Sequence, residues 1–76
     1  MKKSEIMVGG IYSNKPGCIY CEEREIVNMV YPRRFQIDSD CVEYKVVSGR
    51  RSGILATMTR ARFAAWAKRR VDNDQD

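Results

Sequence analysis

The segment from residue 41 to residue 58 places the strongest constraint on how this chain folds. It reads CVEYKVVSGRRSGILATM, and its first half alternates apolar Val42, Tyr44 and Val46 with polar Glu43 and Lys45. Strict alternation is the period of a strand with one buried face. Because SGRRSG is a turn bracketed by two glycines, the pattern predicts a β-hairpin in which GILATM pairs back on CVEYKVV.

More strands are predicted before this hairpin. IMVGGIYSN indicates a strand around its glycine pair, followed by the turn SNKPG, where Pro fixes φ and Gly can take a positive φ. CIYCEEREIVNMVY is strand-like, with Ile19, Cys21 and Glu23 on one face. Ile26 falls on the other face, which indicates a bend or bulge near Glu23 to Glu25. PRRFQIDSD, from 32 to 40, begins with Pro and ends in turn formers.

A closing helix is predicted from about Arg60 to Arg70, with Thr59 as its N-cap. On this helix Phe63, Trp66, Ala67 and Arg70 form one stripe. Burying a Phe and a Trp contributes several kcal/mol, which a small domain can hardly forgo, so core packing is favoured over a stacking platform for bases. The predicted core is Tyr12, Val42, Tyr44, Val46, Phe63 and Trp66.

Four or five short strands with regular turns predict a mainly β fold, a small antiparallel barrel closed by the helix. A chain of 76 residues is one domain of marginal stability. We expect order from about residue 5 to 71 and a flexible acidic tail over 72–76.

Positive charge is concentrated near the C-terminus. Residues 49–71 contain seven basic and no acidic side chains, whereas residues 1–48 are balanced and the tail DNDQD takes back three charges. The basic groups do not share one helix face, which argues against a helix that reads a DNA major groove. A solvated basic face is one interpretation and contact with a partner or with phosphate is the other. The residues proposed for such contact are Arg50, Arg51, Arg60, Arg62, Lys68, Arg69 and Arg70.

The three cysteines are weak candidates for metal ligands. Cys18 and Cys21 have the spacing of half a zinc site, and Cys41 is a conceivable third ligand. Without a histidine or a fourth cysteine, a structural site would need a carboxylate such as Glu22 or Asp40, which is an uncommon ligand set. Free thiols, buried or half-buried, are therefore expected rather than zinc, a redox pair or a disulfide framework. We expect no cofactor.

Catalysis and membrane insertion are not expected. The chain has no histidine, no Gly-rich phosphate loop and no nucleophile elbow. It has no apolar run of the roughly 20 residues that span a bilayer, and no signal peptide. A cytoplasmic protein that works by binding is the expectation.

The order of short motifs VGGIY, REIVNM, VEYKV and RFAAWA resembles small proteins of bacteriophages and prophages. Those proteins have SH3-like barrels that end in a short helix with a Phe-x-x-Trp-Ala motif, which here is Phe63 to Ala67, and the resemblance covers roughly residues 8 to 67. It implies an SH3-like barrel of four or five strands and an accessory phage protein in the host cytoplasm. That class includes inhibitors of host defence and modulators of host nucleic-acid machinery. The resemblance carries over no catalytic or binding residue.

Three functions are compatible with these features. The first is a non-enzymatic protein that binds and blocks a host protein or nucleoprotein complex through its basic C-terminal surface. The second is direct nucleic-acid binding by an SH3-like module, against which the modest net charge of +4 and the acidic tail argue. The third is a homo-oligomer that holds a small anionic ligand between subunits. The partner, the strand order and the oligomeric state stay open.

Overall fold

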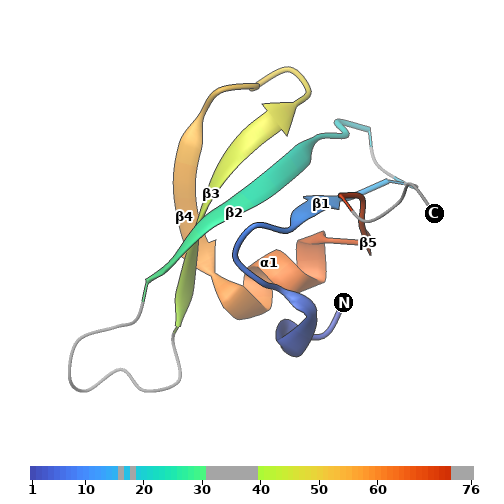
Figure 1. The fold of residues 1–76 in the computed structure, drawn as a ribbon. Helices are drawn as coiled ribbons and strands as arrows, with labels where there is room; N and C mark the ends of the chain where they lie inside the picture. The colour runs from blue at the N-terminus through green and yellow to red at the C-terminus, as the bar shows by residue number, and fades with distance from the viewer. Residues whose placement is uncertain (16, 18, 31–39, 73–76) are drawn as a thin grey trace.

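The computed structural model describes residues 1–15, 17, 19–30 and 40–72. These residues form strands β1 (Ile11–Ser13), β2 (Glu23–Val30), β3 (Cys41–Ser48), β4 (Leu55–Thr59) and β5 (Arg69–Arg70), a 3-10 turn η1 (Lys3–Glu5) and a helix α1 (Arg60–Trp66). The strands make one antiparallel sheet in the order β4-β3-β2-β1-β5 (Figure 1). The prediction of a mainly β fold with one short helix on the C-terminal side is confirmed.

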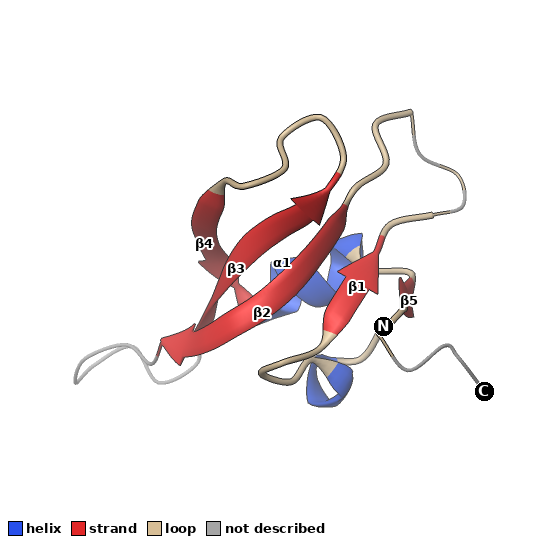
Figure 2. Cartoon of the chain, turned by 45° about the horizontal axis from the view of Figure 1, so that its top comes forward, coloured by secondary structure: helices blue, strands red, loops and turns tan. Residues whose placement is uncertain are grey.

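The sheet is not closed by strand pairing. Its edge strands β4 and β5 pair with β3 and β1 respectively, and not with each other. Helix α1 packs against η1, β3 and β4, and Figure 2 shows it on one side of the sheet. The sheet is therefore covered on one side by α1, and β4 and β5 do not pair to close it.

The hairpin of β3 and β4 has the predicted strands and turn. Tyr44 lies opposite Ala56 in the ladder. Gly49 and Gly53 have φ angles of 121° and 99°, a region that favours glycine. A Cβ atom on Gly49 would lie 2.8 Å from the Cβ of Glu22. The turn thus packs directly against the segment that precedes β2.

Strand β2 starts later than the strand-like pattern predicts. Residues 19–22 form a loop, because the Glu22 N–H is taken by the side chain of Asn14 rather than by a neighbouring strand. The ladder with β3 shifts register between Glu23 and Arg24, where the bulge was predicted. With this register Arg24 and Ile26 are both buried.

Helix α1 starts as predicted and ends early. Thr59 caps it, with its hydroxyl oxygen accepting the N–H of Arg62 at 3.2 Å. The helix ends at Trp66 because Ala67 is extended, with φ −74° and ψ 133°. The predicted extension to Arg70 is wrong, since this part of the chain becomes β5 and pairs with β1 instead. Arg70 is therefore not on the helix stripe.

The core is one cluster around Phe63. The centroid of its ring lies 5.6 Å from that of Tyr12, 5.7 Å from that of Tyr44 and 5.2 Å from that of Trp66. Trp66 is half-buried and packs against the cluster, whereas the other five predicted core residues are buried. The largest buried apolar side chains are Ile6, Tyr12, Ile26, Val42, Tyr44, Val46 and Phe63.

The glycine pair before β1 forms a turn, not the predicted strand. Gly9 has a φ of 90°, and a Cβ atom on Gly10 would lie 2.5 Å from the Tyr12 hydroxyl oxygen. That hydroxyl donates to the Glu5 carbonyl at 2.7 Å and accepts the Met7 N–H at 2.9 Å. These two hydrogen bonds hold the N-terminal segment against β1.

The chain after β5 is also held against the sheet, by contacts of Asp72. Asp72, which the sequence assigns to the flexible tail, accepts the N–H of Ile11 at 3.0 Å and pairs with Arg70 at 2.7 Å. The rest of that tail, 73–76, lies outside the described residues. The same holds for Tyr31, at the end of the predicted strand-like segment, and for residues 32–39 of the predicted turn segment. No helix in the described part of the chain has the length and apolar character needed to cross a membrane.

Candidate functional site

Two of the arginines predicted to bind a partner are engaged inside the fold. Arg60 pairs with Asp40 at 3.3 Å and donates to the carbonyl of Ile6 at 3.0 Å. Arg70 donates to Asp72, and this hydrogen bond raises the pKa of Arg70 and lowers that of Asp72. Arg60 therefore links α1 to the residue before β3 and to the N-terminal segment, whereas Arg70 holds Asp72, whose carboxylate accepts the N–H of Ile11 in β1.

The other predicted basic residues are exposed. Arg51 forms an ion pair with Glu22, although half of the Arg51 side chain is exposed. Arg62 lies four residues before Trp66 on α1, and so on the same side of the helix. Among the residues that the structure describes, no ion pair is made by Arg50, Arg62, Lys68 and Arg69.

A pocket opens between the β3–β4 turn, the loop before β2 and the end of α1. It has a volume of about 550 Å3 and brings together three guanidinium groups, one carboxylate and two aromatic rings. Such an excess of positive charge in a concave site attracts anions. We call it the arginine pocket, and its lining is Tyr20, Cys21, Glu22, Arg24, Arg50, Arg51 and Trp66.

Arg24 forms the floor of this pocket and is only 8% exposed. Its guanidinium carbon lies 3.9 Å from the ring centroid of Trp66 and 4.6 Å from that of Tyr44, so two aromatic faces stabilise the charge. Its Nε donates to Glu22 at 2.5 Å. Arg24 follows the register shift at the start of β2 and shares the buried face of that strand with Ile26, two residues later.

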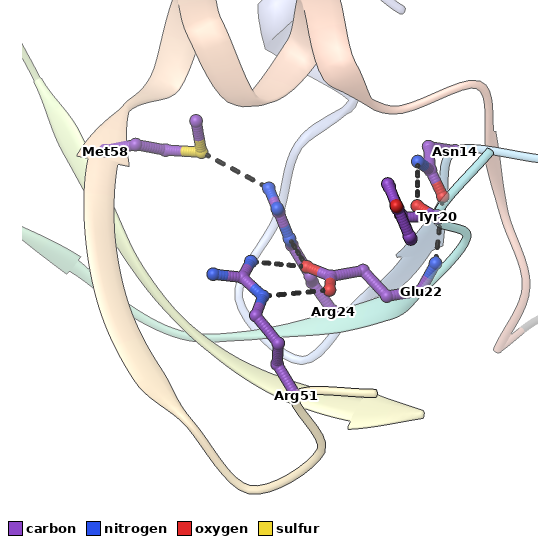
Figure 3. A network of polar contacts seen from close by, with 6 residues as sticks. All are labelled: Asn14, Tyr20, Glu22, Arg24, Arg51 and Met58. Carbon is purple, nitrogen blue, oxygen red and sulfur yellow. Dashed lines mark hydrogen bonds and ion pairs between the residues drawn. The ribbon is translucent and has the colours of Figure 1, made fainter. Parts of the chain in front are cut away.

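Glu22 joins the floor of the pocket to its rim (Figure 3). Arg51 donates to both of its carboxylate oxygens, from Nε at 3.3 Å and from Nη2 at 2.9 Å, while Arg24 donates to Oε2. Burial raises the pKa of Glu22, but the hydrogen bonds and charges of Arg51 and Arg24 outweigh burial and hold this pKa below its ordinary value. The carboxylate is therefore charged at neutral pH.

Asn14 fixes the loop that carries Glu22 and Tyr20. Its Oδ1 accepts the N–H of Glu22 at 3.0 Å, and its Nδ2 donates to the carbonyl of Tyr20 at 3.2 Å (Figure 3). The Tyr20 ring is largely exposed, and the guanidinium carbon of Arg50 lies 5.5 Å from its centroid. An aromatic group and a cation thus stand side by side at the rim.

Cys21 also lines the pocket, and it is disulfide-bonded. The expectation of a free thiol is wrong for this residue. That expectation was based on the number of cysteines and on the missing metal ligands. Neither indicates where the loop at residues 19–22 places Cys21 in the fold. Cys18 lies outside the described residues, and Cys41 is half-buried at the start of β3. Within the described ranges, no group of three or more His, Cys, Asp or Glu side chains is placed to hold a metal ion.

Sequence reasoning identified Arg50 and Arg51 but missed the rest of the arginine pocket. The signal for Arg24 was present, because Arg24 precedes Ile26 by two residues and so shares its face of the strand. A buried arginine needs hydrogen-bond acceptors or an opposite charge, and the nearby carboxylate of Glu22 can provide both. Nothing local in the sequence indicates that Trp66 and Tyr20 meet there.

The fold and the pocket define a small, open, five-stranded antiparallel protein with a basic, aromatic-walled cavity. Comparison of the chain with protein-family models, with curated proteins and with solved structures finds no match.

Proposed function

We propose that this protein works by binding rather than by catalysis, and that its partner is a protein with an acidic surface. The contact region is the arginine pocket together with Arg62 on the adjacent helix face. The observation that carries the proposal is the convergence of Arg24, Arg50 and Arg51 on a cavity that has one carboxylate of its own.

The charge of this region is presented by rigid elements. Arg24 is held between two aromatic rings, and Arg50 and Arg51 stand on a tight turn that packs on Glu22. Preorganised charges lose little conformational freedom on binding, which favours affinity. The lack of histidine in the sequence leaves the commonest general base out of any catalytic scheme, which also supports binding.

The resemblance to small phage proteins extends this proposal. It suggests an accessory protein that engages a host protein or nucleoprotein complex in the host cytoplasm and blocks it by occupancy, as an inhibitor of host defence does. A small rigid domain with a charged pocket suits such a role because blocking requires contact area and no chemistry.

Affinity capture from bacterial lysate tests the proposal. The tagged protein is compared with an Arg50→Gln/Arg51→Gln variant and with a Lys2→Gln/Lys45→Gln variant that loses the same charge away from the pocket. We expect a discrete protein band that survives nuclease treatment, is lost with the arginine variant and is kept with the lysine variant. Equal loss with both variants would contradict a specific site, because net charge alone would then explain capture.

Direct binding of nucleic acid is the second candidate. It is favoured by the exposed side chains of Arg62, Lys68 and Arg69, which make no ion pair with another described residue. It predicts that nuclease removes the captured material, and that binding weakens steeply as salt is raised because phosphate contacts release counterions. A protein band unaffected by nuclease would reject this candidate.

A further inference from the structure

We infer that the arginine pocket receives a carboxylate side chain from an extended acidic segment of the partner, with an apolar neighbour of that carboxylate packing on Ile19 and Tyr20. This inference rests on the proposed function, because it names the chemical group that the pocket recognises.

The donors of Arg24 are the first reason. This side chain is about nine-tenths buried, yet among the described residues only its Nε reaches an oxygen, that of Glu22. Its Nη1 lies 3.6 Å from the sulfur of Met58, which is a weak acceptor, and the described residues offer its Nη2 no acceptor. Among the described residues, the side-chain nitrogen that is fully buried without a hydrogen-bond acceptor is Arg60 Nε, and no nitrogen of Arg24 is in that state. The open donors of Arg24 therefore reach the pocket, where a ligand oxygen can satisfy them.

Glu22 is the second reason, because it shows that the pocket accepts a carboxylate. Arg51 holds Glu22 in a two-point geometry typical of arginine and carboxylate. Since the Arg51 side chain is 50% exposed, that ion pair is screened and can exchange. Arg50 has no carboxylate partner among the described residues, so its guanidinium group at the rim is available to a ligand. An incoming carboxylate can thus bind Arg50 and Arg51 while Glu22 stays on Arg24.

The rim favours a peptide over a nucleic acid. Tyr20 is 69% exposed with Arg50 over its ring, and Ile19, the preceding residue in the chain, is 90% exposed, so the loop that carries the rim also offers apolar surface. Trp66 has Arg24 over its ring and Phe63 tilted against it at 5.2 Å, which leaves it unsuited to stacking on bases.

An NMR titration tests the inference with three probes at equal ionic strength. They are the blocked peptide Gly-Glu-Leu-Glu-Gly, the same peptide with both Glu replaced by Gln, and a thymidine oligonucleotide of about eight nucleotides. We expect the acidic peptide alone to shift the Nε–Hε signals of Arg24, Arg50 and Arg51 and the indole signal of Trp66. The expected affinity is on the order of 1 mM, since the probe is short.

Variants sharpen the outcome. Arg51→Gln should weaken binding of the acidic peptide about fivefold or more, Lys45→Gln should leave it unchanged, and Glu22→Gln should strengthen it because the internal competitor is gone. The indole near-UV circular dichroism shows whether each variant keeps its fold. Equal binding of the Gln peptide, tighter pocket binding of the oligonucleotide, or shifts outside the pocket would overturn the inference.

The two proposals fail separately. If lysate capture requires Arg50 and Arg51 but the acidic peptide does not bind the pocket, the carboxylate inference is wrong and the proposed function stands. If the peptide binds and no protein is captured through these arginines, the pocket recognises carboxylates and the proposed function is wrong.

Discussion

At the scale of single residues, Glu22 couples three parts of the structure, since it joins the loop before β2 to Arg24 and to the β3–β4 turn. Burial and the two arginines act in opposite directions, and the arginines hold its pKa below the ordinary value of 4.5. The folded protein therefore keeps this carboxylate charged at a pH where the unfolded chain already takes up a proton. The resulting contribution to stability is complete above about pH 4.5 and is lost as the pH falls through the folded pKa.

We predict that Arg51→Gln reduces this acid sensitivity, because one of the two groups that lower the pKa of Glu22 is gone. The measurement is the free energy of unfolding in urea, taken for the native chain and the variant between neutral pH and about pH 3. Lys45→Gln removes one positive charge from the exposed part of β3 and should follow the native curve. If Arg51→Gln and Lys45→Gln give the same pH dependence, the Arg51–Glu22 pair does not affect stability in solution.

At the scale of elements, α1 depends on its N-cap, because the helix has seven residues and so few internal hydrogen bonds of its own. Thr59→Ala removes the acceptor of the Arg62 N–H and should cost about 1 kcal/mol of unfolding free energy. Thr57→Ala is the matched control, since Thr57 is exposed on the same strand and caps nothing. Equal losses in urea unfolding would mean that the change reflects β4 and not the cap.

Elements encoded by neighbouring residues were predictable, and those set by distant contacts were not. The β3–β4 hairpin and the Thr59 cap are local patterns, and the structure has both. The end of α1 was missed because the chain after Trp66 pairs with β1, about sixty residues earlier in the sequence. The arginine pocket was only half foreseen for the same reason. Its turn is local, but its floor and its aromatic wall come from segments that meet only in the folded sheet.

At the scale of the whole molecule, stability depends on one small core. Globular domains have about 0.05–0.15 kcal/mol of stability per residue, which gives about 4–11 kcal/mol for 76 residues. Phe63 is fully buried and its ring touches those of Tyr12, Tyr44 and Trp66, so it connects β1, β3 and α1. Replacing a buried Phe by Ala costs about 3–5 kcal/mol. One side chain thus accounts for a large part of the total.

We therefore predict that Phe63→Ala lowers the urea midpoint sharply or leaves the domain unfolded at 25 °C. Leu55→Ala, at a site 59% exposed on edge strand β4, should change stability by no more than about 0.5 kcal/mol. The milder Phe63→Leu variant keeps the domain folded enough to compare Trp66 fluorescence with far-UV circular dichroism. Coincident transitions would show that sheet, helix and pocket unfold as one unit, because Trp66 belongs to both the core and the pocket wall. A separate, earlier Trp66 transition would mean that the pocket opens while the sheet persists.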